Sequence, residues 1–344
     1  FGSNRKTKLI EGGDALIAER IANQRPNKEL QRINALKQLS VDSEIIIQSN
    51  NEVKIVSSIT IKKLGLKENN QERKNNLPTK LIWPIKNEPK ILAVSELGKI
   101  GLLKWEFAGQ KPGPIEQFLP SGLENDKIIN FIPLSEKNNV SLGLISNDGK
   151  FKRIEINEIT DISNRATTIL KLKDDIKLKC CFLCEENSYI LIITDIGRII
   201  KFKITEKDFP FMGKLAQGNN IIKLFPGENI IEVLKINEEQ AKDLILITNK
   251  GYFIKNKTKK IKISKKGELG TLGINYNKKF NERVISCFLY NQFVFVKTNQ
   301  EKYERLETDQ INMSPYKKET KLKIKLNENE VIKSIFSMII PENN

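Results

Sequence analysis

The side chains that could do chemistry in this chain are mostly basic. Its 344 residues include 58 Lys and Arg against 42 Asp and Glu, a net charge of +16, and no histidine. The lack of histidine excludes Ser-His triads, histidine general bases and His-ligated metals. Cys181 and Cys184 have zinc-knuckle spacing, but no second pair accompanies them, so we predict buried strand cysteines. There is no Gly-x-x-x-x-Gly-Lys-Ser/Thr loop, and we expect no cofactor in this chain.

Many of the basic residues follow the turn of a repeated hairpin. In the clearest copy, residues 189–204, two β-branched runs flank Thr194-Asp195-Ile196-Gly197, where Gly supplies the positive φ that such a turn needs. Six copies follow one another at spacings of 46 to 54 residues. Their turn positions are Glu52, Gly98, Gly149, Gly197, Gly251 and Glu301, so that Glu replaces Gly in the first and last copies.

A period of about 50 residues suits one four-stranded blade, and each unit is too small to bury its apolar face alone. We therefore predict an all-β, six-bladed propeller-like array over residues 44–344. Residues 1–43 differ from the rest and are predicted to be a connector with short helices at 14–25 and 29–39. The chain starts with Phe, which favours a piece of a longer protein, and it has no apolar run that could span a bilayer. Trp83 and Trp105 follow apolar strands, and we predict that they pack within blades.

The repeated signature resembles the C-terminal domain of the bacterial DNA gyrase A protein, which the related component of topoisomerase IV shares. The signature is an apolar run, Thr-Asp-x-Gly-Arg-x-x-Lys, a basic loop, Ile-x-Lys-Leu, a turn and a second apolar run. The opening stretch Phe1 to Thr7 is similar to the junction between that family's coiled-coil region and this domain. The resemblance implies a six-bladed β-pinwheel, whose strands exchange between neighbouring blades and whose basic rim wraps duplex DNA.

One family feature is missing from the first repeat. Gyrase members of the family carry a Gln-Arg-Arg-Gly-Gly-Lys-Gly box there, and the corresponding stretch Ser57 to Lys80 has none. The nearest echoes, Lys214 to Asn220 and Lys265 to Gly270, lack the paired Arg. The resemblance therefore leaves open a topoisomerase IV-like role beside a gyrase-like one.

Duplex DNA is a line of phosphates, so affinity depends on how many basic groups share one surface. Each predicted hairpin has basic residues after its turn, and Lys250 to Lys266 contains eight lysines and no acid. With no motif for reading bases, we expect contacts to the DNA backbone and bending. The predicted DNA-contacting residues are Lys54, Lys99, Lys104, Lys152, Arg153, Arg198, Lys201, Lys214, Lys255, Lys257, Lys259, Lys260, Lys262, Lys265, Lys266, Lys302 and Arg305.

These observations favour a domain that binds, wraps and bends duplex DNA without sequence specificity, as an accessory part of an ATP-dependent type IIA topoisomerase. The resemblance places the catalytic Tyr, ATP and Mg²⁺ elsewhere in the enzyme, so this fragment is predicted to have no activity of its own. Its expected partners are the upstream cleavage domain and an ATPase of the gyrase B type. The isolated domain is expected to be a monomer in the bacterial cytoplasm, associated with the nucleoid. The alternative is a propeller platform for protein–protein interaction with an incidental basic surface.

Overall fold

The computed structural model describes most of the chain from residue 42 onward. The described residues are 39, 42–67, 77–86, 88–134, 140–159, 165–236, 242–249, 252–274, 282–290, 293–308, 320–321, 327 and 330–341. The predicted helices at 14–25 and 29–39 fall almost wholly outside these ranges, as does most of the predicted connector. The first strand begins at Ser43.

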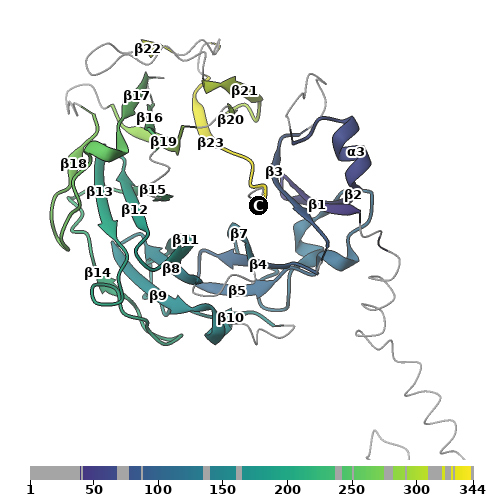
Figure 1. Ribbon diagram of the computed structural model, residues 1–344, viewed down its shortest axis with the longest axis horizontal. Helices are drawn as coiled ribbons and strands as arrows, with labels where there is room; N and C mark the ends of the chain where they lie inside the picture. Colours follow the sequence, from purple (N-terminus) through teal and green to yellow (C-terminus); the bar gives the residue numbers. More distant parts are fainter. Residues whose placement is uncertain are drawn as a thin grey trace, which may run out of the picture.

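Six antiparallel sheets are arranged as blades around a central axis (Figure 1). The two middle strands of each blade form the predicted hairpin. They are β1 (Ser43–Gln48) and β2 (Glu52–Ser57), β4 (Lys90–Ser95) and β5 (Lys99–Leu102), β8 (Val140–Ser146) and β9 (Lys150–Glu155), β12 (Tyr189–Thr194) and β13 (Arg198–Lys203), β16 (Leu244–Thr248) and β17 (Tyr252–Asn256), and β20 (Phe293–Thr298) and β21 (Tyr303–Glu307). The six-bladed all-β prediction is therefore confirmed.

A third strand from the same repeat pairs with the first hairpin strand and lies nearest the axis (Figure 1). These inner strands are β3 (Thr79–Pro84), β7 (Ile128–Leu134), β11 (Leu178–Glu185), β15 (Ile230–Ile236), β19 (Val284–Leu289) and β23 (Ile332–Phe336). The pairing is antiparallel throughout, and in blade four β12 has β13 on one side and β15 on the other.

The fourth strand of each of the first five blades comes from the following repeat. It is a two-residue strand at the outer edge: β6 (Gly113–Pro114), β10 (Thr167–Thr168), β14 (Asn219–Asn220), β18 (Thr271–Leu272) or β22 (Thr320–Lys321). Each pairs with the first residues after a hairpin turn, as Leu272 and Thr271 do with Arg198 and Ile199. This exchange between neighbours is the pinwheel arrangement that the resemblance implied.

The exchanged segment explains why most turns need Gly. Gly98 has φ +75°, and a Cβ built on it would lie 2.6 Å from the carbonyl oxygen of Leu170, in the segment arriving from the next repeat. The residue must therefore adopt a left-handed conformation and also leave room for a neighbouring backbone. In the first copy the positive φ belongs to Asn51 (65°), and Glu52 already begins β2, so the predicted turn position was one residue too late. Glu301 does occupy the turn position in the last copy, with φ 58°.

The Asp of the turn signature joins one blade to the next. Asp195 Oδ1 accepts a hydrogen bond from the backbone N–H of Asn229 at 2.9 Å, and Oδ2 accepts one from Nη1 of Arg283 at 2.7 Å. Arg283 precedes the inner strand of blade five. Lys177 and Glu96 form the corresponding pair between blades two and three, at 2.6 Å.

Short helical segments fill the connections. They are α3 (Ser58–Lys63), η1 (Trp105–Phe107), η2 (Ile115–Phe118), η3 (Ile156–Ile159) and η4 (Thr258–Lys260). Helix α3 lies where the first repeat lacks the gyrase box. Ser57 caps it, because its hydroxyl accepts from the backbone N–H of Thr60, and Ile61 anchors it to the core.

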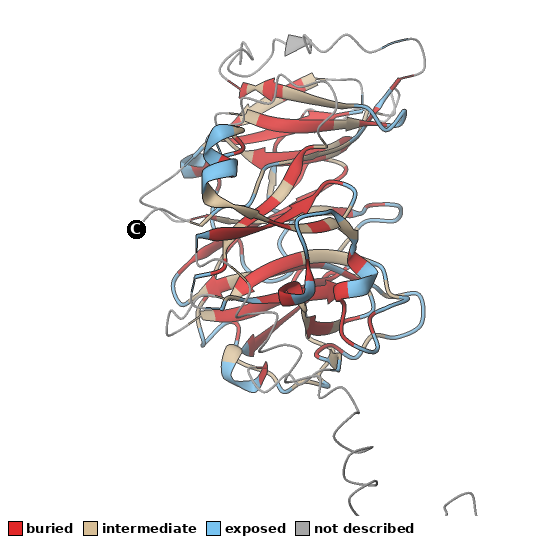
Figure 2. Ribbon diagram, turned by 90° about the vertical axis from the view of Figure 1, so that its right-hand side faces the viewer, coloured by how far each residue is buried: buried red, intermediate tan, exposed pale blue. Residues whose placement is uncertain are grey.

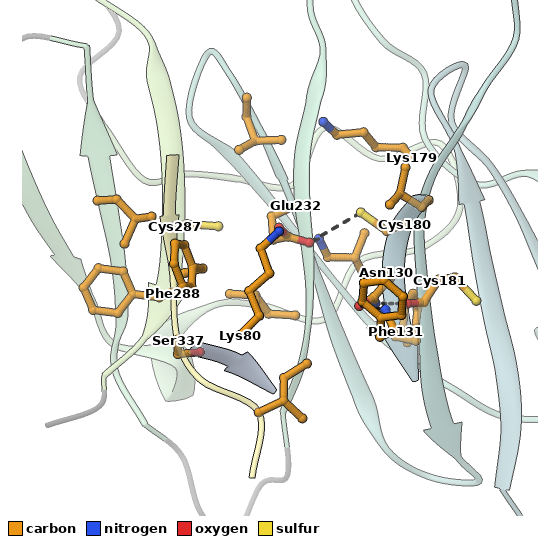
Figure 3. A pocket seen from close by; sticks show the side chains of 18 of the residues that line it. Lys80, Asn130, Phe131, Lys179, Cys180, Cys181, Glu232, Cys287, Phe288 and Ser337 are labelled. Carbon is orange, nitrogen blue, oxygen red and sulfur yellow. Dashed lines mark hydrogen bonds between the residues drawn. The ribbon is translucent and has the colours of Figure 1, made fainter. Parts of the chain in front are cut away.

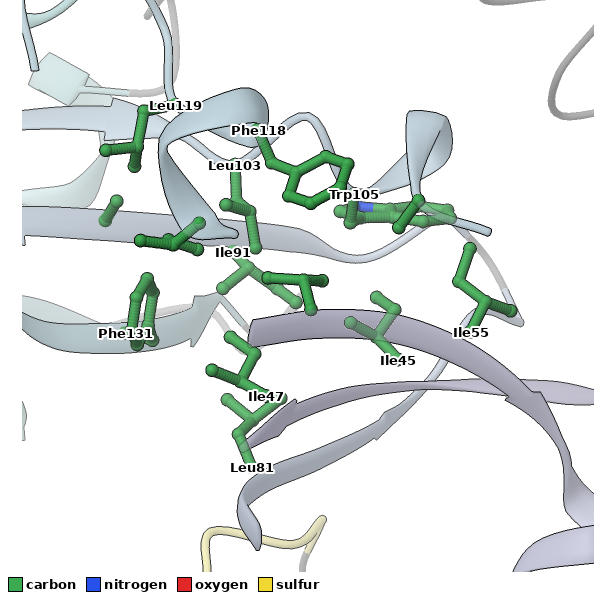
Figure 4. Close-up of a cluster of buried hydrophobic side chains, with 14 of the residues drawn as sticks. Ile45, Ile47, Ile55, Leu81, Ile91, Leu103, Trp105, Phe118, Leu119 and Phe131 are labelled. Atoms are coloured by element: carbon green, nitrogen blue, oxygen red, sulfur yellow. The ribbon is translucent and has the colours of Figure 1, made fainter. Parts of the chain in front are cut away.

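The hydrophobic core lies between blades, so both faces of the hairpin strands are buried (Figure 2). Ile91 and Ala93 of β4 pack with blade one, in the cluster shown in Figure 4, whereas Leu92 and Val94 pack with blade three. Burial on both faces gives continuous apolar runs instead of strict alternation. Trp105 belongs to the same cluster as Ile91, and its indole N–H donates to the carbonyl of Pro89 at 2.8 Å, which confirms its predicted packing role.

The C-terminal segment links blade six to blade one. Ile339 N donates to the carbonyl of Lys80 at 2.8 Å, and Ile82 N donates to the carbonyl of Ile339 at 3.0 Å. These bonds add the segment as a parallel neighbour of β3, the inner strand of blade one. Figure 1 shows the C-terminus between β23 and β3, where this contact joins the two ends of the blade array.

Candidate nucleic-acid interface

Four of the predicted DNA-contacting side chains are buried, and this corrects the prediction for them. Lys152, Arg153, Arg198 and Lys201 are between 1% and 5% exposed. They follow their turns at the strand positions where the exchanged segment covers the blade edge. None of the four presents its charge to solvent, so a phosphate cannot reach it in this structure.

Lys152 points into a cage of backbone carbonyl groups. Its Nζ donates to the carbonyls of Ile169 at 2.5 Å, Lys214 at 2.7 Å and Ala216 at 3.4 Å. The carbonyls of Lys214 and Ala216 belong to the segment that leads into β14. Burial lowers the pKa of the Lys152 ammonium from its usual 10.5 to about 8. This lysine therefore holds an exchanged segment in place.

Arg198 has the same role in blade four, with a complete set of partners. Its Nε and Nη2 form a two-point pair with the carboxylate of Glu228 at 2.7 and 2.8 Å. Nη2 also donates to the carbonyl of Lys223 at 2.9 Å, and Nη1 donates to that of Leu269 at 3.3 Å. The guanidinium lies 4.7 Å from the ring centre of Phe225. The pair connects three segments of the chain at one buried point.

Arg153 and Lys201 are likewise engaged inside. Arg153 pairs with Glu186 at 2.8 Å and stacks 4.4 Å from the ring centre of Phe211. The ammonium of Lys201 lies 4.7 Å from the ring centre of Tyr189. Cation–π contacts of this kind replace part of the hydration that a buried cation loses.

A second group of predicted residues is partly or fully exposed but joined to acids. Lys99 pairs with Asp126 at 3.2 Å, Lys255 with Asp243 at 2.7 Å, and Arg305 with Glu307 at 2.6 Å. Lys302 pairs with Glu304. Exposed ion pairs are weak, so these side chains could exchange an acid for a phosphate at little cost. Lys54, Lys104 and Lys214 are partly exposed.

The predicted residues that stand together in solvent are six lysines of the fifth repeat, called here the lysine patch. The patch consists of Lys257, Lys259, Lys260, Lys262, Lys265 and Lys266, all exposed. Buried Thr258 and Ile261 fix its backbone: the Thr258 hydroxyl donates to the carbonyl of Lys242 at 2.8 Å. Its second half crosses the outside of blade four, where Ser264 N donates to the carbonyl of Lys201 at 2.7 Å.

The exchanged segments also display basic residues that sequence reasoning missed. Lys111 and Arg165 each stand two positions before an exchanged strand, β6 and β10 respectively, and both are exposed. Two residues that the sequence did predict stand in the same segments: Lys214, partly exposed, lies five positions before β14, and Lys266, exposed, lies five positions before β18. Solvent-accessible cations thus accompany the outer edge of the first four blades. The sequence signal for these exposed basic residues is their position shortly before an exchanged strand. That signal can be used only once the exchanged strand has been located.

The inner strands enclose a central cavity of about 620 Å³ (Figure 3). Glu232 projects into it, and burial raises the pKa of its carboxyl group. The thiol of Cys180 lies 3.5 Å from Glu232 Oε1, and burial raises the pKa of the thiols of Cys180 and Cys287 well above the usual value. Protonated thiols are poor nucleophiles and metal ligands. All four cysteines are buried and free, as predicted for strand cysteines.

Among the described residues, no group of three or more His, Cys, Asp or Glu side chains is placed to hold a metal ion. Within the same part of the chain, no helix is long and apolar enough to cross a membrane.

The repeats match a known family. The family described as "DNA gyrase C-terminal domain, beta-propeller" matches residues 144–175, 188–237 and 242–291, which contain the hairpins of blades four and five and most of the hairpin of blade three. Three of the six repeats are thus similar to this family. The matched repeats include the buried positions Lys152 and Arg198 and the whole lysine patch.

Curated relatives belong to two related enzymes. The DNA gyrase A protein of Clostridium acetobutylicum is 28% identical over 242 residues, which cover 67% of this chain and 27% of that protein. The DNA topoisomerase 4 A protein of Synechocystis is 23% identical over 192 residues, or 52% of this chain and 20% of that protein. The chain thus spans about a quarter of the length of these relatives.

Solved structures share the fold. The C-terminal domain of DNA topoisomerase IV superposes with a TM-score of 0.73 at 16% identity, covering 87% of this chain and 94% of that domain. The DNA gyrase A C-terminal domain superposes with a TM-score of 0.64 at 15% identity, covering 86% of this chain and 99% of that domain. Both are similar to this pinwheel in its blade arrangement.

Proposed function

We propose that this domain binds duplex DNA around its outer rim and bends it, without reading sequence, as an accessory part of a type IIA topoisomerase. The lysine patch carries the proposal, because six exposed lysines on 257–266 are a density of charge that a line of phosphates complements. The exposed cations Lys111 and Arg165 beside the exchanged strands would extend the contact to blades one and two.

Similarity to the gyrase A family supports the wider setting of the proposal. DNA cleavage and ATP hydrolysis, with their Tyr, ATP and Mg²⁺, would belong to other parts of the enzyme, including a cleavage domain and an ATPase of the gyrase B type. This domain would act as a monomeric module that selects the DNA segment presented for strand passage. Its place of work would be the bacterial cytoplasm, at the nucleoid.

A charge-neutralised variant tests the proposal. Changing Lys257, Lys259, Lys260, Lys262 and Lys265 to Gln removes five charges from exposed side chains, so stability should change by less than about 0.5 kcal/mol per site. The affinity for a plain duplex at moderate salt should fall at least about tenfold, and the slope of log affinity against log salt should become shallower by up to about 4.5.

The matched control removes five charges from exposed lysines of blades one and two: Lys62, Lys63, Lys86, Lys90 and Lys127. It carries the same change in net charge, so it separates a general charge effect from a local one. Equal losses in the two variants would count against a specific path over blade five. Unchanged binding in both would favour the platform for protein partners.

A further inference from the structure

Three exposed apolar side chains lie around buried Arg198 at the outer edge of blade four. Leu269 is 61% exposed, Leu272 59% and Phe225 45%. Phe225 covers the guanidinium, and Leu272 is the register partner of Arg198 across the exchanged strand. Leu269 is tied to the same guanidinium through its carbonyl group. We call these three residues the apolar edge.

The apolar edge stands on a rigid support. Arg198 and Glu228 are buried and joined by two hydrogen bonds, and Glu228 also accepts from the backbone N–H of Phe225 at 2.8 Å. Gly270, between the two leucines, has φ +75°, and a Cβ there would lie 2.6 Å from the carbonyl of Ile199. The backbone bearing these side chains is therefore fixed from below.

Cations frame the apolar edge. Lys223 and Lys265 are exposed and precede Phe225 and Leu269 in sequence, and Gly267 N donates to the carbonyl of Ile221 at 3.0 Å, which joins the two segments. The ammonium of Lys266 is turned to the carbonyl of Asp208, and the carboxylate of exposed Glu268 accepts from the backbone N–H of Lys265 at 2.8 Å. A partner for this surface must offer anionic groups beside an apolar contact. The minor groove of duplex DNA has that form, since two lines of phosphates border sugars and stacked bases.

We propose that the apolar edge enters the minor groove as a wedge, with Leu269 and Leu272 opening a base step and kinking the duplex where it passes blade four. This inference rests on the proposed function and assigns the bend to one place on the rim. Apolar wedges of Leu or Phe kink DNA in this way when neighbouring basic residues hold the backbone. Pyrimidine–purine steps such as TA unstack most easily, so the bend should centre on them.

The test uses Leu269→Ala/Leu272→Ala in the whole 344-residue chain. Both side chains are mostly exposed, and Phe225, which packs on Arg198, stays in place. The matched control is Ile59→Ala/Leu97→Ala, two exposed apolar residues of blades one and two that are 63% and 45% exposed. Affinity, end-to-end FRET and the fluorescence of 2-aminopurine at a central TA step are measured on a duplex of about 40 base pairs, beside a duplex without that step.

The original chain should prefer the duplex with the TA step by about fivefold, shorten its end-to-end distance and raise its 2-aminopurine signal. The double variant should keep total affinity within about threefold but lose the preference and the fluorescence change, whereas the control keeps both. Retained binding with unchanged bending and fluorescence in the double variant overturns the wedge and leaves the proposed function standing. Absence of duplex binding by the original chain overturns both, and equal losses in the control overturn the assignment to blade four.

Discussion

Replacing Arg198 by Met separates an interior role of this residue from a DNA-contacting one. Met keeps much of the aliphatic volume and removes the guanidinium. The change leaves the Glu228 carboxylate, whose side chain is 1% exposed, without its cation. It also removes the donors to the carbonyls of Lys223 and Leu269 and the cation that faces Phe225.

Breaking a buried ion pair by removing one partner costs about 3–5 kcal/mol, because the remaining charge stays buried and uncompensated. The free energy of unfolding, measured by urea titration, should therefore fall by that amount in Arg198→Met. The double variant Arg198→Met/Glu228→Met removes both charges and should be at least about 2 kcal/mol more stable than the single variant. Affinity for duplex DNA, corrected for the folded fraction, should stay within about threefold of the original.

The opposite pattern would refute the reasoning. If Arg198→Met unfolds within about 1 kcal/mol of the original chain while its DNA affinity drops about tenfold, the guanidinium acts at the surface. If Arg198→Met/Glu228→Met is less stable than Arg198→Met, then the Glu228 side chain stabilises the fold in other ways than by compensating the charge of Arg198.

Two other predictions follow from single residues. Because the Lys152 pKa is lowered to about 8 in the folded chain and is near 10.5 in the unfolded chain, the unfolded state binds more protons between these values, and this group makes stability rise with pH there. Between about pH 7.5 and 9.5, the free energy of unfolding of the original chain, measured by urea titration, should rise by about 1–2 kcal/mol relative to that of Lys152→Met. If the two chains differ in this free energy by the same amount at both pH values, the buried position of Lys152 is contradicted. Gly98→Ala should cost more than about 2 kcal/mol, because its Cβ would meet the carbonyl of Leu170, whereas Gly227→Ala, also at positive φ but with open space, should cost about 1 kcal/mol. If Gly98→Ala and Gly227→Ala lose equal free energy of unfolding in thermal or urea titrations, the positive φ alone accounts for the cost and the space around the Cβ does not.

The repeated hairpins could be predicted because their signals are local. Five of the six hairpins have a described turn residue at positive φ between two apolar runs, whereas the predicted turn position Gly251 lies outside the described residues; the period gives the number of blades. The first turn was misplaced by one residue because Asn51 also tolerates positive φ and stands next to Glu52. Helix α3 was not predicted. Its main local signal is the Ser57 cap, which is a single residue in a stretch that was compared only with the gyrase box.

The exchanged strands could not be predicted from the repeats alone, and neither could the burial or exposure of each basic residue. Thr271 and Leu272 are too few to show a strand pattern, and their partners lie in the preceding repeat. Whether Arg198 is covered depends on those segments, since Leu269 and Phe225 come from different parts of the chain. The lysine patch was predictable because no acid interrupts it and no segment in the described residues buries it.

The salt dependence of duplex binding tests the central claim most directly. Affinity of the chain for a plain duplex of about 40 base pairs would be measured between about 50 and 200 mM salt. A rim that neutralises about six or more phosphates over several blades predicts a slope of log affinity against log salt of about −5 or steeper. A slope near about −1, or no measurable binding at the lowest salt, would contradict a DNA-wrapping rim.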